Sequence, residues 1–160
     1  MISAPNSEKK LLAWWTGLPS SLIFLGFPEQ TSMPKYYQRM LAHKIIDAGA
    51  DGIIGHHPHW PQAVEMYKNR PVIYSLGNFI NGFYNNKEHD NIMAALYFDR
   101  NVLERVELIP LAGKNSEIGF QPHVMTGKAA VNHLREIQSM SRQLGTAVSI
   151  ENERGVLLPR

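Results

Sequence analysis

Polar and apolar residues repeat with a helical period over residues 35–48, "KYYQRMLAHKIIDA". Pro34 stands just before this segment and Gly49 is placed to end it, so the pattern predicts a helix between them. The apolar positions of its predicted buried face are Tyr37, Leu41, Ile45 and Ala48, flanked by Met40 and Ile46. The short apolar run "DGIIG" follows, and such a helix–strand step favours parallel pairing in an α/β fold.

The rest of the chain reads mainly as strands. An apolar run predicts a buried strand at 22–25, and "QAVEMY" and "PVIYSLG" predict a pair joined by the turn "KNR". "NIMAALYFD" and "VLERVELIPL" predict a second pair, and the loop "NGFYNNKEHDN" separates the two pairs. A last helix is predicted over 128–144 with a buried face formed by Ala129, His133, Ile137 and Met140.

Composition and charge narrow the class of protein. Hydrophobic residues make up 44% of the 160 residues and charged residues 19%, as in globular proteins. We therefore predict one α/β domain over 1–160, with frayed ends over 1–10 and 150–160. The net charge of +2 and the lack of a basic run predict no nucleic-acid partner. Cysteine is absent, which excludes disulfides and thiolate metal ligands.

The N-terminal run "KKLLAWWTGLPSSLIFLGF" has the layout of a signal peptide, with two lysines before an apolar stretch. Gly17, Pro19 and two serines interrupt the stretch, and no small-residue cleavage site follows it. It is also too short and too broken to cross a membrane as a helix. The sequence therefore predicts neither an export signal nor a membrane segment here.

The stretch "GHHPHW" places His56, His57 and His59 within four positions, with Pro58 between the last two. Residues two apart in an extended segment point to the same side, so His57 and His59 are expected on one face and His56 on the other. Pro58 fixes its own φ and favours an extended conformation at His57. Two neutral imidazoles on a stiff segment after a strand are suited to a divalent metal ion.

The same pattern also fits a turn with a purely structural role. The sequence therefore leaves two interpretations open, a metal site and a structural turn. A catalytic metal needs at least three protein ligands as a rule, and no third ligand stands nearby in the sequence. The other histidines are expected on the surface or hydrogen-bonded in the core; they are His43, His89, His123 and His133.

The segment "AHKIIDAGADGIIGHHPHWPQAVEMYKNRPVIYSLGNFI" resembles the CapA family of capsule and poly-γ-glutamate biosynthesis proteins. That family typically shows the series "DAGAD…GHHPH…Q.VE.Y…P..YSLGNF", and weaker similarity continues through "ELIPL" and "GFQPH". The positions that match are Gln38, Asp47 to Asp51, Gly55, His57, Pro58, His59, Gln62, Glu65, Tyr67, Pro71 and Tyr74 to Phe79.

The resemblance implies a fold, a site and a setting. The fold would be a partial layered α/β/β/α sandwich of the metallophosphoesterase type, with mixed sheets and flanking helices. His57 and His59 would correspond to the closing histidine pair of its metal site, which holds a divalent ion such as Mn, Fe, Zn or Mg. Asn78, His56 and Glu29 are placed near that site, although Asn78 also fits a residue that stabilises its own turn. The activity would be that of a phosphoesterase-like hydrolase at the cell envelope.

The match is incomplete in ways that leave alternatives open. Family members carry acidic ligands, including a bridging "GD" aspartate, in an N-terminal half that has no counterpart here. In place of an "HWG.E" element the chain has "FLGFPE", with Phe24 where histidine is expected and Glu29 displaced by one position. We therefore expect the C-terminal half of a CapA-like protein, with a half metal site or none. It would be an enzyme only when completed by an N-terminal half, and a non-catalytic module or a self-associating half-domain are the alternatives.

Overall fold

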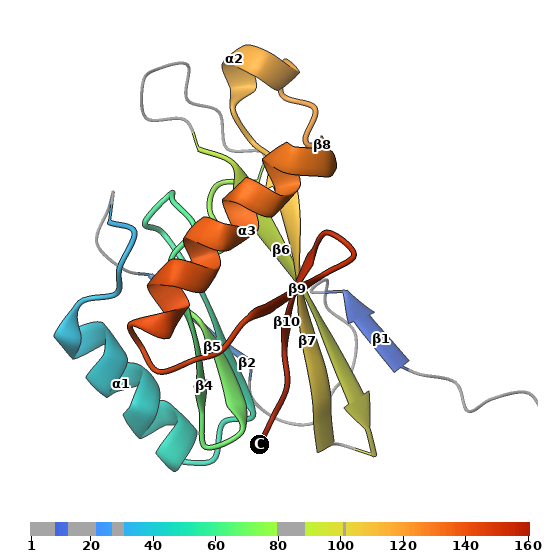
Figure 1. Cartoon of the computed structure of the whole chain (residues 1–160). Coiled ribbons are helices and arrows are strands. Elements are labelled where there is room, and N and C mark those ends of the chain that lie inside the picture. The colour runs from blue at the N-terminus through green and yellow to red at the C-terminus, as the bar shows by residue number, and fades with distance from the viewer. Residues whose placement is uncertain (1–8, 13–21, 27–30, 80–88, 101) are drawn as a thin grey trace, which may run out of the picture.

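The computed structural model describes residues 9–12, 22–26, 31–79, 89–100 and 102–160. They form two sheets and three helices (Figure 1). The strands are β1 (Lys9–Leu12), β2 (Leu22–Gly26), β3 (Gly52–His56), β4 (Val64–Tyr67), β5 (Arg70–Ile73), β6 (Asn91–Asp99), β7 (Val102–Ala112), β8 (His123–Val124), β9 (Ser149–Glu151) and β10 (Arg154–Leu157). The helices are α1 (Tyr36–Asp47), α2 (Asn115–Ile118) and α3 (Gly127–Arg142).

The two sheets differ in strand direction. The mixed sheet has the order β2-β3-β5-β4, with β2, β3 and β5 parallel and β4 antiparallel to β5. The antiparallel sheet has the order β1-β6-β7-β10-β9, with β8 added beside β7. The predicted α/β class, with two sheets and flanking helices, is confirmed. The second sheet is antiparallel, because hairpin connections pair neighbouring strands in opposite directions.

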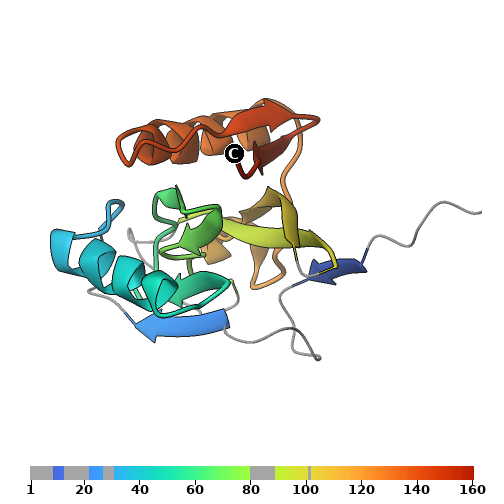
Figure 2. The ribbon, with the colours of Figure 1, turned by 90° about the horizontal axis from the view of Figure 1, so that it is seen from below.

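Two apolar clusters hold the layers together. One lies between the sheets and α3, and it joins residues such as Ile54 of the mixed sheet, Leu108 of the antiparallel sheet and Leu134 of α3. The other lies between α1 and the opposite face of the mixed sheet, where Ala42 and Ile46 meet Val72. Figure 2 shows α3 along one side of the strands, with the β9–β10 hairpin beside it. The mixed sheet is thus covered on both faces.

Both long helices form where the sequence predicts them, but each turns a different face inward. On α1 the buried residues are Gln38, Ala42 and Ile46, whereas Tyr37 and Leu41 are exposed. Gln38 can be buried because its side-chain oxygen accepts a hydrogen bond from the backbone N–H of Lys35. The buried face inferred from apolar residues alone is therefore displaced by about one residue from the face that the structure buries.

On α3 the buried residues are Ala130, Leu134, Ile137 and Ser141. Of the predicted face only Ile137 is fully buried, while Ala129 is exposed. The polar Ser141 is buried because its hydroxyl donates to the Ile137 carbonyl and accepts from the backbone N–H of Val64 in β4. This bond fixes the rotation of α3 against the mixed sheet.

The C-terminal residues 150–160 are not frayed, contrary to prediction. β9 and β10 form a hairpin turned by Asn152 and Glu153, both at positive φ. Val156 and Leu157 are each 2% exposed, so apolar burial anchors the end of the chain. At the other end, only Lys9 and Lys10 of residues 1–10 are described, in β1, and residues 81–88 of the predicted loop lie outside the described residues. In the part of the chain that the structure describes, no helix is long and apolar enough to cross a membrane.

Candidate metal site

The histidine segment directly follows β3, a central strand of the mixed sheet. The backbone does not stay extended there, because φ is +90° at His57 and +63° at His59. Positive φ is unfavourable for residues other than glycine and costs of order 1–3 kcal/mol each, so the surroundings must hold the turn. The ring centroids of His57 and His59 are 5.7 Å apart. The predicted proximity of the two rings is present, but it arises from a tight turn rather than from strand alternation.

One hydrogen bond sets the state of the His59 ring. Nδ1 of His59 lies 2.5 Å from Oδ1 of Asn78. Because an amide oxygen only accepts, Nδ1 carries the proton and the lone pair of the neutral ring is on Nε2. Metal-binding histidines are commonly oriented in this way by a hydrogen bond to the other ring nitrogen. Asn78 is therefore in contact with the candidate site, as well as being part of a turn.

A buried asparagine holds Asn78 in place. The backbone N–H of Asn78 donates to Oδ1 of Asn91 over 2.7 Å, and Asn91 is fully buried at the start of β6. Nε2 of His133 on α3 lies 3.2 Å from the Asn91 carbonyl. A chain of hydrogen bonds thus runs from His59 through Asn78 and Asn91 to His133. The role of Asn91 could not be predicted from local pattern, since its partners lie 13 and 42 positions away along the chain.

Replacing Gly77 with alanine is expected to destabilise this turn. Gly77 has a φ of +90°, and a Cβ atom there would lie 2.2 Å from Oδ1 of Asn91. Gly145 is a matched control, because its φ is +77° and a Cβ atom would meet nothing within 4 Å. Alanine at positive φ costs about 1–2 kcal/mol, and the clash at Gly77 should add about 1–3 kcal/mol. Urea unfolding of the two variants measures the difference, and equal losses would contradict the packing around Asn91.

The described residues bring together two candidate metal ligands, His57 and His59. No group of three or more His, Asp or Glu residues suited to one ion occurs in the described ranges. Glu29, which we placed near the site, lies outside the described residues. His56 ends β3, and desolvation lowers the pKa of its imidazole. The ring separation and the Asn78 bond fit a two-histidine half of a divalent metal site.

A second cluster of charged residues lies on the α1 side of the mixed sheet. Oε1 of the buried Glu65 is 3.2 Å from Nη2 of Arg39 and 3.0 Å from Nε2 of His43. Oε2 accepts from the hydroxyl of Tyr74, over 2.6 Å. Burial and the adjacent carboxylate raise the pKa of Tyr74 well above its usual range. Arg39 and His43 lie on α1 and Glu65 lies on β4, so their contacts join those two layers, while the Tyr74 bond stays within the sheet layer.

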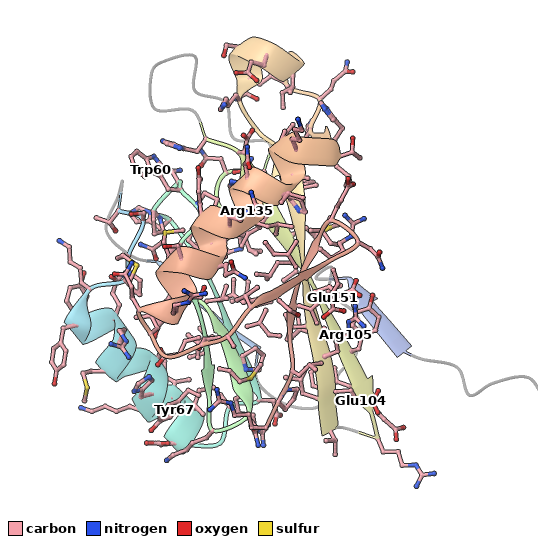
Figure 3. The ribbon with its side chains drawn as sticks, in the orientation of Figure 1. Trp60, Tyr67, Glu104, Arg105, Arg135 and Glu151 are labelled. Carbon is pink, nitrogen blue, oxygen red and sulfur yellow. The ribbon has the colours of Figure 1, made fainter. Side chains whose placement is uncertain are left out.

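A cleft of about 660 Å³ lies beside the histidine segment, where Trp60 and Pro61 form part of its wall. The facing residues come mostly from α3, including His133 and Glu136. Figure 3 shows Trp60 beside α3, which forms the facing wall of this cleft. The sequence did not predict this cleft, because it forms only when α3 packs against the mixed sheet.

Two sheets with helices packed on them, and a histidine pair after a central parallel strand, define a layered α/β protein with a candidate metal site at the strand ends. Residues 26–83 match the family described as bacterial capsule synthesis protein PGA_cap. The resemblance to the CapA family is thus confirmed for the segment that contains the histidine pair.

Three relatives illustrate the match. The chain is 36% identical over 83 residues to the PGA biosynthesis protein CapA of Bacillus subtilis, and 35% identical over 83 residues to the capsule biosynthesis protein CapA of Bacillus anthracis. These alignments cover 52% of this chain and 22% and 20% of the relatives. The chain is also 25% identical over 179 residues to the uncharacterized protein y4sH of Sinorhizobium fredii, covering 78% of this chain and 37% of that one. The chain therefore spans well under half the length of these relatives.

Proposed function

We propose that this chain supplies the His57–His59 half of a divalent metal site in a CapA-like, phosphoesterase-type hydrolase of capsule or polyglutamate synthesis at the cell envelope. The observation that supports this most directly is the hydrogen bond from Nδ1 of His59 to Asn78, because it leaves the ring in the tautomer that binds metals through Nε2. The relatives' names supply the biological setting.

The roles of the residues follow from their positions. His57 and His59 would hold the ion, and Asn78 would orient His59 through its amide oxygen. A bound divalent ion supplies a Lewis acid and lowers the pKa of a coordinated water. Two neutral imidazoles leave the charge of the ion uncompensated, so acidic ligands from another segment or another subunit would have to complete the site.

The second candidate is a non-catalytic module in which the histidine turn is structural. The observation that favours it is the Asn78–Asn91 chain, which would hold the turn whether or not a metal binds. Under this hypothesis the histidine pair contributes to stability and not to metal affinity.

Calorimetric titration with zinc and manganese separates the two candidates. The protein is compared with the double variant His57→Ala/His59→Ala and with His123→Ala, which removes an exposed histidine of β8. We expect saturable zinc binding to the unchanged protein. The zinc affinity of the double variant should be lower by more than the 10–100-fold that a residue supporting a ligand contributes. It should be unchanged in His123→Ala. Identical isotherms for all three proteins would eliminate the metal site.

A further inference from the structure

The cleft beside Trp60 has the size and lining of a small-molecule site. Its volume of about 660 Å³ lies within the range of ligand pockets, roughly 300–1,000 Å³. Pro61, Ile137 and Met140 give it an apolar wall, and charged or hydrogen-bonding side chains stand around that wall. None of the residues that line it belongs to the candidate metal site.

In this cleft His133 and Glu136 each offer one hydrogen-bond acceptor, and the two acceptors face each other. Nε2 of His133 faces the Asn91 carbonyl, which only accepts, so the proton of the neutral ring is on Nε2 and the lone pair is on Nδ1. Nδ1 lies 3.8 Å from Oε2 of Glu136. A donor nitrogen or oxygen placed between them can reach both at about 2.8–3.0 Å. The pair is therefore arranged to receive an N–H or O–H donor.

The charges of the cleft favour a positively charged donor. Asp90 and Glu136 bring two negative charges and Lys114 brings one positive charge, so the lining has an excess of one negative charge when its histidines are neutral. Lys114 is itself 3.7 Å from Asp90, which reduces its attraction for an anion. Desolvation lowers the pKa of His89, which keeps that ring uncharged near neutral pH. An anionic polymer segment would be repelled.

Trp60 supplies a flat surface at the same place. Its indole stands 3.9 Å from the His89 ring, centroid to centroid, and it lines the cleft together with the acceptor pair. Indole rings attract both apolar groups and cations. A ligand that combines an ammonium group with a flat apolar group would use both features.

We propose that this cleft binds a small molecule carrying a primary ammonium group on a flat apolar group. The ammonium donates to Nδ1 of His133 and to the Glu136 carboxylate, and the apolar group packs against Trp60. The proposal does not depend on the metal site, although the hydrogen-bond chain through Asn91 and Asn78 connects His133 to His59.

The test uses three probes of nearly equal shape: benzylamine, benzyl alcohol and benzoate. Each is titrated into ¹⁵N-labelled protein at low salt, and the Trp60 indole and α3 amide signals are followed. We expect saturable shifts with benzylamine, weaker ones with benzyl alcohol and none with benzoate. Glu136→Gln should weaken benzylamine binding about three- to fivefold, as expected for a partly exposed ion pair.

Glu104→Gln is the matched control, because Glu104 is exposed on β7 and points away from the cleft (Figure 3). It removes the same charge and should leave benzylamine binding unchanged. The proposal is overturned if benzoate or benzyl alcohol binds as tightly as benzylamine, or if the two variants lose affinity equally. The same spectra show whether each variant is folded, so a loss of binding is not confused with unfolding.

Discussion

Replacing Glu65 with alanine is expected to lower the free energy of unfolding by about 3–5 kcal/mol, the usual cost of breaking a buried charge pair. The Glu65 carboxylate is the shared partner of Arg39, His43 and Tyr74. Its removal leaves the hydroxyl of Tyr74, a fully buried residue, without this acceptor and leaves Arg39 without its carboxylate. The contact between α1 and the mixed sheet should weaken most.

Urea unfolding, followed by circular dichroism, measures this loss. Glu104→Ala is the control, since an exposed glutamate with no such partners should change stability by no more than about 0.5 kcal/mol. A loss for Glu65→Ala that is as small as that of the control would mean that the cluster does not join the two layers.

Replacing Leu134 with alanine is expected to have the second large effect, lowering the free energy of unfolding by about 2–5 kcal/mol. Leu134 is fully buried between α3 and the two sheets, so truncation leaves a cavity in the main core. Met140 is on the face that the sequence pattern favours, yet it is only partly buried and lines the cleft. Met140→Ala should cost less than half as much.

Thermal unfolding of the two variants distinguishes the two possible orientations of α3. A loss of 1 kcal/mol lowers the melting temperature of a domain of this size by about 2–4 °C, so the two variants are readily separated. If Met140→Ala destabilises the protein more than Leu134→Ala, the helix faces the core as the pattern predicts and not as the structure shows.

Strands β2 to β7 could be predicted well because their apolar runs and turns are local signals, whereas β9 and β10 lie largely where a frayed end was predicted. The "KNR" turn, for example, has positive φ at Lys68 and Asn69, as a tight hairpin requires. The helix faces could not be predicted equally well, because the polar residues Gln38 and Ser141 are buried, and Ser141 bonds to Val64, a partner that only the tertiary structure brings near. A polar residue at a helix position is counted as exposed unless its partner is known.

The candidate site was predicted in part. The pairing of His57 and His59 follows from their spacing, although the backbone that produces it has positive φ at both residues. The family resemblance placed Asn78 near the site, but its hydrogen bond to His59 could not be predicted, since 19 positions separate the two residues in sequence. Asn91 and His133 were not associated with the site, because they lie on β6 and α3 and are linked to His59 only through the hydrogen bonds of the folded chain.

Many residues that carry the family resemblance hold the fold together. Glu65 and Tyr74 form the buried cluster under α1, and Gln62 donates from its side chain to the Thr31 carbonyl over 2.7 Å. These buried polar groups need specific partners, which explains why such a motif is informative about the fold. It is less informative about the chemistry, for which His57 and His59 are the candidate residues.

We propose that His57 and His59 together bind one divalent ion, with the His59 ring oriented by Asn78. Long-range ¹H–¹⁵N spectra of the histidine side chains test it most directly, recorded before and after one equivalent of zinc. We expect an Nδ1–H tautomer for His59 without zinc, and zinc-dependent shifts of a ring nitrogen in both His57 and His59, with His123 unchanged. An Nε2–H tautomer for His59, or zinc shifts at His123 with none at this pair, would contradict it.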